Sequence, residues 1–113
     1  METRTWKTAP NLNPVEGVKI SIIGDGKNLT YCYITCKPGA LIDDHSHHNE
    51  QVGTCIQGVG TLVSGGKTLK IKPGLSWLIP PNEVHKFTAE GEKEVILIEA
   101  FSPPRIDYTS VAR

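Results

Sequence analysis

The chain has 113 residues, which is enough for a single domain that buries roughly two-thirds of the surface exposed by its unfolded form. Its 12 basic and 12 acidic residues cancel, and no Lys/Arg cluster is interleaved with aromatic residues, so nucleic acid is not an expected partner. Residues 1–10 lack the apolar segment of a secretory signal, and no run approaches the roughly 18 apolar residues of a membrane span. We therefore expect a cytoplasmic protein that does not act at a membrane.

Eight short segments rich in β-branched and aromatic residues follow one another along the chain. No segment of useful length has the period of an amphipathic helix. An N-terminal arm, residues 1–15, and a C-terminal tail, residues 103–113, flank them. Residues 16–102 are expected to form one all-β domain with strands at residues 18–23, 29–36, 51–57, 61–64, 68–71, 76–79, 84–88 and 95–101.

Glycine and proline separate these segments, as in Lys37-Pro38-Gly39 and Gly65-Gly66. Eight short strands joined by tight turns predict an antiparallel sandwich or barrel, and we favour the jelly roll, also called the double-stranded β-helix. Such a small sheet protein has exposed edge strands, so a homodimer is expected. The arm could add a strand across the dimer, with Trp6 packed on the neighbouring subunit.

The chain has three cysteines, Cys32, Cys36 and Cys55, which is an odd number and does not form a disulfide framework. This usage is typical of a reducing compartment. Cys32 and Cys36 share one face of a strand. Burial as small hydrophobic residues is the favoured reading of this pair, and metal ligation is the alternative.

Three of the four histidines form the most informative pattern in the sequence. His45, His47 and Gln51 share one parity along the chain, so on a strand they would point to one side, and His85 would arrive from another strand. Imidazole is a common ligand of divalent transition metals. The pattern predicts a metal site made by these four residues. His48 has the opposite parity and is expected to face solvent or an interface.

These residues carry a resemblance to the cupin superfamily, which implies a jelly-roll barrel with a metal at its centre. The first cupin motif is matched by Gly39, His45, His47 and Gly58, and the second by Gly74, Pro80 and His85.

Three positions depart from the cupin motifs. Asn82 replaces a glycine and Ala89 replaces an asparagine. Gln51 stands where most cupins carry a ligand glutamate, and Glu50 beside it has the wrong parity. An uncharged fourth ligand leaves the metal formally doubly positive, which favours Lewis-acid chemistry over high-valent iron.

A narrower resemblance is to the small KdgF-type cupins of pectin degradation, which open the ring of 4,5-unsaturated uronates. They also have two His, one Gln and a later His, followed by a terminal strand and F-[ST]-P-P-R, here Phe101 to Arg105. The resemblance implies that Phe101 and Arg105 bind the substrate and that Glu99 and Arg105 act in catalysis. Gly53 departs from it, because the family carries a polar pocket residue there.

The residues alone leave several of these roles open. Glu99 could face the barrel interior, where burial would raise its pKa toward the range of an acid/base group, or it could face solvent. Arg105 could present its planar fork to a carboxylate or be a solvated tail residue. Trp77 and Phe87 are explained by packing against the sheet, and we assign them no chemistry.

The expected function is that of a metal-dependent cupin enzyme that moves a proton on a small sugar-derived carboxylate, with KdgF-like ring opening as the specific case. One divalent transition metal is expected per chain, with Ni, Zn, Mn, Fe and Co all compatible with the ligand set. The alternatives are an Fe(II)-dependent dioxygenase and a non-catalytic module that binds a metal and a sugar.

Overall fold

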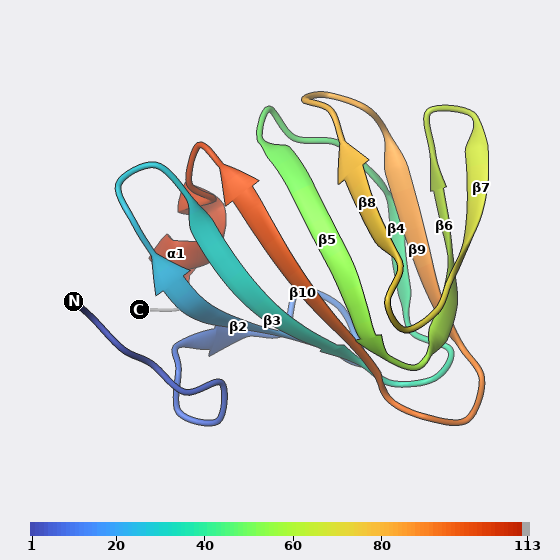
Figure 1. Cartoon of the computed structure of the whole chain (residues 1–113), viewed down its shortest axis with the longest axis horizontal. Coiled ribbons are helices and arrows are strands. Elements are labelled where there is room, and N and C mark those ends of the chain that lie inside the picture. Colours follow the sequence, from blue (N-terminus) through green and yellow to red (C-terminus); the bar gives the residue numbers. More distant parts are fainter. Residues whose placement is uncertain (112–113) are drawn as a thin grey trace.

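The computed structural model describes residues 1–111, which form two antiparallel sheets packed face to face (Figure 1). The fold is the predicted all-β jelly roll. The six-stranded sheet has the order β1 (Asn11–Leu12), β2 (Val18–Asp25), β3 (Thr30–Cys36), β10 (Val95–Ser102), β5 (Glu50–Gln57) and β8 (Ser76–Ile79). The four-stranded sheet has the order β4 (Leu41–His45), β9 (His85–Glu90), β6 (Val59–Ser64) and β7 (Lys67–Ile71).

Three elements were not predicted: β1, β4 and the helix α1 (Ile106–Val111). Strand β4 has the sequence LIDDH, whose consecutive Asp43 and Asp44 are both exposed, so it lacks the alternation of apolar and polar residues that marks a strand. It lies at the edge of its sheet, paired only with β9 among the described strands. The helix has only six residues, too few to show a helical period.

The arm and the tail both pack on the barrel of their own chain. Strand β1 pairs with β2, and the ring of Trp6 stacks on Tyr33 with centroids 4.9 Å apart. Trp6 remains 53% exposed, and its packing on a neighbouring subunit stays a prediction. At the other end, the backbone N–H of Arg105 donates to Thr30 Oγ1 over 2.9 Å. The predicted tail thus includes α1, and its residues 112 and 113 lie outside the described residues.

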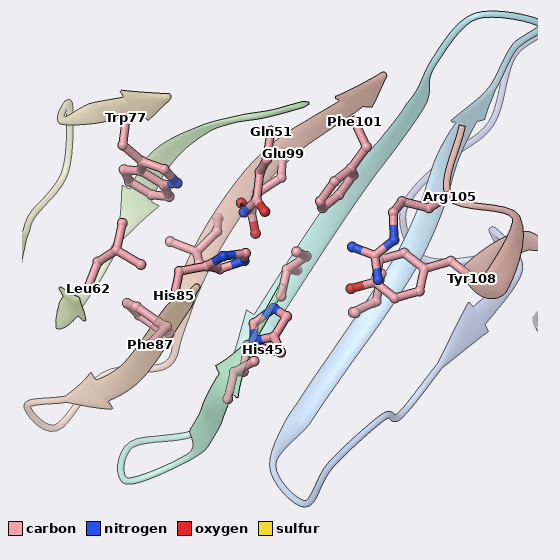
Figure 2. A pocket seen from close by; sticks show the side chains of 14 residues that line it. His45, Gln51, Leu62, Trp77, His85, Phe87, Glu99, Phe101, Arg105 and Tyr108 are labelled. Carbon is pink, nitrogen blue, oxygen red and sulfur yellow. Dashed lines mark hydrogen bonds between the residues drawn. The ribbon is translucent and has the colours of Figure 1, made fainter. Parts of the chain in front are cut away.

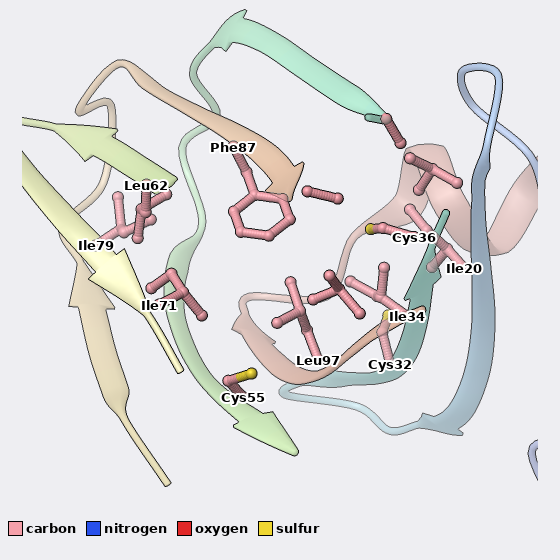
Figure 3. Packing of buried hydrophobic residues seen from close by; sticks show 14 of the residues in the cluster. Ile20, Cys32, Ile34, Cys36, Cys55, Leu62, Ile71, Ile79, Phe87 and Leu97 are labelled. Carbon is pink, nitrogen blue, oxygen red and sulfur yellow. The ribbon is translucent and has the colours of Figure 1, made fainter. Parts of the chain in front are cut away.

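The core fills the space between the two sheets (Figure 3). Cys32 and Cys36 belong to it: both are fully buried free thiols, and burial raises the pKa of each to about 12. The raised pKa opposes the thiolate form in which cysteine binds metals, and neither residue belongs to the histidine cluster described below. The favoured reading of these cysteines, as small core residues, agrees with this packing.

No helix within residues 1–111 is long and apolar enough to cross a membrane.

Candidate metal centre and adjoining pocket

The four predicted metal ligands meet at one end of the barrel, where the chain passes from one sheet to the other. His45 ends β4 and His85 begins β9, and the two are direct partners in the sheet register. His47 lies in the loop that leads from β4 to β5, and Gln51 is the second residue of β5. The residues therefore converge because this loop crosses between the sheets. The predicted reason, a shared parity along one strand, is wrong.

Each of the three imidazoles is oriented by a backbone carbonyl two residues away. The Nδ1 atoms lie 2.8 Å from Asp43 O for His45, 3.0 Å from Asn49 O for His47 and 2.9 Å from Glu83 O for His85. A carbonyl oxygen only accepts, so Nδ1 carries the proton and Nε2 keeps its lone pair in each neutral ring. The potential ligand atoms of the three rings lie within 4.8 Å of one another.

Two observations show that this donor set fits a metal ion. His85 Nε2 is buried and has no hydrogen-bond partner among the described residues, and burial lowers the pKa of this ring to about 4, so the atom is an orphaned acceptor. His47 Nε2 lies 3.0 Å from Gln51 Oε1, so two acceptors face each other. The pKa of His47 is lowered by burial and by Arg105, which opposes a bridging proton. Two ligand atoms at right angles around an ion, with bonds of about 2.1 Å, would be about 3 Å apart. The distance between His47 Nε2 and Gln51 Oε1 matches this spacing.

The amide of Gln51 is oriented by Glu99. Gln51 Nε2 donates a hydrogen bond to Glu99 Oε2, which leaves Oε1 on the side of the imidazoles. Glu50, by contrast, is exposed. An ionised Glu99 would place one negative charge a single hydrogen bond behind the ligand set, so the centre is less positive than Gln51 alone indicates.

Glu99 faces the barrel interior and is only 6% exposed, which excludes the alternative that it faces solvent. Burial raises its pKa to about 7, against the lowering effects of hydrogen bonds from Gln51 and Trp77 and of the Arg105 charge. Strand β10 alternates regularly, with Val95, Leu97 and Phe101 on the same buried side. The carboxyl group can therefore exchange a proton near neutral pH.

A cavity of about 40 Å³ is lined by three of the four candidate ligands, His45, Gln51 and His85 (Figure 2). Its walls are mainly apolar, with Leu62 and Phe87 among them. The polar groups on its walls are His45, Gln51, Trp77, His85, Glu99, Arg105 and Tyr108.

Arg105 is buried beside this cavity and is not a solvated tail residue. Its Cζ lies 3.8 Å from the Tyr108 ring centroid and 4.9 Å from that of Phe101. Nε and Nη2 donate to the Asp107 carboxylate over 3.0 and 2.8 Å, while Nη1 is buried with no partner in residues 1–111. Asp107 thus already binds one edge of the guanidinium that was predicted to bind a substrate carboxylate, and Nη1 is the donor that remains free. Phe101 also meets the edge of His47, with centroids 5.6 Å apart.

The family of the chain follows from its match to the profile described as "Cupin domain" over residues 32–101. The chain belongs to the cupin family. This cupin is 31% identical to the L-ectoine synthase of Aliivibrio fischeri over 90 residues, which are 79% of this chain and 70% of that protein. Over the same shares it is 28% identical to the L-ectoine synthase of Vibrio campbellii.

Two solved structures share the fold of this cupin over nearly its whole length. KdgF from a Halomonas species has a TM-score of 0.85 at 22% identity, over 94% of this chain and 98% of that one. An RmlC-like cupin from Shewanella frigidimarina has a TM-score of 0.85 at 24% identity, over 95% of each chain. At these identities the likeness establishes the jelly-roll architecture alone.

One departure from the cupin motifs has a simple structural explanation. Asn82, which stands in place of a glycine, has a φ of 67°. This left-handed conformation is natural to glycine, and asparagine tolerates it better than most other residues. The turn before His85 therefore has a backbone conformation typical of glycine although asparagine occupies it.

Sequence reasoning missed two residues of the site. Trp77, to which packing alone was assigned, packs against the core and also lines the cavity beside Glu99. Phe87 belongs to the core as expected, and its ring is part of the apolar wall of the same cavity. Asn49 is buried, accepts from His47 and donates through Nδ2 to Pro103 O over 2.5 Å, so it connects the ligand loop to the segment that carries Arg105. Asn49 lies two residues from both His47 and Gln51, and this position was the available signal. No comparable signal marked Trp77.

Proposed function

We propose that this cupin is a metal-dependent enzyme that transfers a proton on a small, carboxylated, sugar-derived substrate. The observation that carries the proposal is a buried carboxyl group, Glu99, with its pKa raised to about 7 on the wall of the same cavity as His45, His85 and Arg105. Perturbed acids of this kind gather at catalytic sites.

The proposed metal ligands are His45, His47, Gln51 and His85. Their support is the oriented Nε2 atoms, the orphaned Nε2 of His85 and the two facing acceptors of His47 and Gln51. One divalent transition metal, with Ni, Zn, Mn, Fe or Co as candidates, would polarise substrate oxygens there as a Lewis acid.

Arg105 and Phe101 would bind and orient the substrate. The free Nη1 of Arg105 is a buried cationic donor, which suits a substrate carboxylate, and Asp107 keeps the guanidinium in place from the other edge. Phe101 lies between Arg105 and His47 and offers an apolar edge to the body of the substrate. These contacts would hold the reacting carbon near Glu99.

The specific reaction we propose is the ring opening of a 4,5-unsaturated uronate, in line with the fold that this chain shares with a KdgF. This is an isomerisation in which no atom is gained or lost. A proton leaves the anomeric hydroxyl, the bond from C1 to the ring oxygen breaks, and a proton adds to C4 as C5 becomes a ketone. Glu99 would accept or deliver one of these protons.

The test is to follow the ultraviolet absorbance of a freshly made unsaturated uronate with metal-saturated protein. We expect the absorbance to fall faster than without protein, and Glu99→Ala and Arg105→Ala to abolish the acceleration at saturating metal. Equal rates with and without wild-type protein would reject this substrate. Oxygen consumption with a candidate substrate would instead indicate a dioxygenase, and a ligand-induced rise in melting temperature without conversion would indicate a binding module.

We also propose that the protein is a homodimer that pairs through the outer face of the six-stranded sheet. Val52, Ile56 and Leu78 lie on this face and are 44%, 51% and 59% exposed, and Val52 is the register partner of Leu78. Apolar side chains gathered on one face are typical of protein interfaces. Light scattering on the eluting protein tests this, with Leu78→Glu expected to yield monomers.

A cytoplasmic location is proposed on the cysteines. All three are free thiols, in agreement with a reducing compartment. Fractionation of cells that express the full chain tests the location.

A further inference from the structure

Three residues of the six-stranded sheet form one row across neighbouring strands. Glu99 on β10 is the register partner of Gly53 on β5, and Gly53 is the partner of Trp77 on β8. Glu99 and Trp77 both line the cavity, on either side of Gly53. The middle position of the row therefore carries no side chain.

The indole of Trp77 occupies the space above Gly53. A Cβ atom built on Gly53 would lie 2.5 Å from both Cε2 and Nε1 of Trp77, which is closer than such atoms approach in proteins. The indole thus depends on glycine at position 53 to lie across the strand. Figure 2 shows its nitrogen on the side of Gln51 and Glu99.

Glu99 accepts a hydrogen bond from Nε2 of Gln51. The indole N–H of Trp77 also favours the ionised carboxylate, because it lowers the pKa of Glu99. When Glu99 is ionised it only accepts, so the Gln51 amide cannot then turn over without placing its oxygen against the carboxylate. In the observed orientation Gln51 Oε1 lies 3.0 Å from His47 Nε2.

We propose that Trp77 and Glu99, with the space left by Gly53, are positioning elements that hold the Gln51 amide with its oxygen toward the three imidazoles. This inference rests on the proposed function only in taking Gln51 as a metal ligand. Gly53 and Trp77 would then help to orient the Gln51 amide in addition to packing in the sheet. Glu99 would orient the same amide in addition to transferring a proton. Groups that orient a metal ligand typically change metal affinity about 10- to 100-fold when removed.

The experiment measures Zn²⁺ affinity of the full chain without substrate, by competition with a chromophoric chelator after metal removal. Glu99→Gln, Trp77→Phe and Gly53→Ala should each weaken Zn²⁺ binding by about 10-fold or more. The matched controls are Glu92→Gln and Trp6→Phe, which make the same changes at exposed positions and should bind as wild type. Circular dichroism of the metal-free variants establishes that each is folded, and Glu99→Gln alone suffices if the other two are not.

A double-mutant cycle separates positioning from any direct effect. Gln51→Ala should weaken Zn²⁺ binding, and adding Glu99→Gln to it should cause no further loss, because the group that Glu99 holds has gone. Additive losses, or Glu99→Gln affinity within twofold of wild type, would overturn the proposal. The Zn²⁺ affinities are measured without substrate, so a failure of the uronate assay does not affect them. If Glu99→Gln lost turnover but kept its Zn²⁺ affinity, Glu99 would act in proton transfer alone.

Discussion

Arg105 and Asp107 form a pair in which the buried member is the cation: the side chain of Arg105 is 7% exposed and that of Asp107 is 63% exposed. Their two hydrogen bonds, 3.0 and 2.8 Å long, hold one edge of the guanidinium and leave Nη1 for another acceptor. Asp107 therefore orients Arg105 from the solvent side without entering the cavity, since it is absent from the cavity walls.

Asp107→Asn should raise KM for a carboxylated substrate about 10-fold and change kcat much less. The reason is that hydrogen bonds between charged groups contribute about 1.5–3 kcal/mol, and the loss falls on binding when the affected group grips a part of the substrate that does not react. Steady-state kinetics on the unsaturated uronate measure this. Glu92→Gln, a charge-removing change at an exposed position, is the control and should leave both constants unchanged. An unaltered KM in Asp107→Asn would mean that Asp107 does not position Arg105.

His85→Ala should reduce the metal content of the purified protein to near zero, because it removes a proposed ligand whose buried Nε2 has no hydrogen-bond partner among the described residues. The matched control is His48→Ala, which removes an exposed imidazole from the adjoining loop and should leave the metal content at the wild-type level. Elemental analysis of protein purified without an affinity tag gives the answer. Equal metal content in the two variants would contradict the assignment of His85.

Glu99 should make the metal-free protein less stable as the pH rises. Its pKa is raised from 4.5 to about 7 on folding, so the folded state binds more protons than the unfolded state between these values. The stabilisation is complete below about pH 4.5 and is lost as the pH rises through about 7. His85 has the opposite sign, because its pKa falls from 6.5 to about 4 and folded-state stability rises with pH across that window.

The two effects are separated by comparing wild type with Glu99→Gln. Melting temperatures of the metal-free proteins are measured at pH 5 and pH 8. Between these values the free energy of unfolding of wild type should fall relative to that of the variant, by on the order of a few kcal/mol. Parallel changes in the two proteins would show that Glu99 keeps an ordinary pKa.

Cys32→Ser should destabilise the protein by about 1–3 kcal/mol and leave its metal content unchanged. The substitution places a hydroxyl in a fully buried position on the barrel interior, where an unpaired polar group costs that much. Urea unfolding measures the first effect and elemental analysis the second. Loss of metal in a folded Cys32→Ser protein would return this cysteine to the list of ligand candidates.

The strands that could be predicted are those with β-branched residues in regular alternation, such as β10, whose buried and half-buried positions follow one another without a break. Strand β4 could not be predicted in this way, since its residues face solvent on one side and pair with only one neighbouring strand described here. The same strand begins the ligand segment. Without it, His45, His47 and Gln51 were placed on one strand, when they belong to a strand end, a loop and a second strand.

The sequence by itself determined the architecture and the ligand residue types, because apolar periodicity, turn residues and histidine spacing are local properties of the chain. Tertiary structure decided what those residues face. Glu99 and Arg105 had two readings each until the packing of β10 and α1 buried both at one cavity. The role of Gly53 could be found only in three dimensions, since the indole that fills its space comes from a residue 24 positions later that the sheet register places beside it.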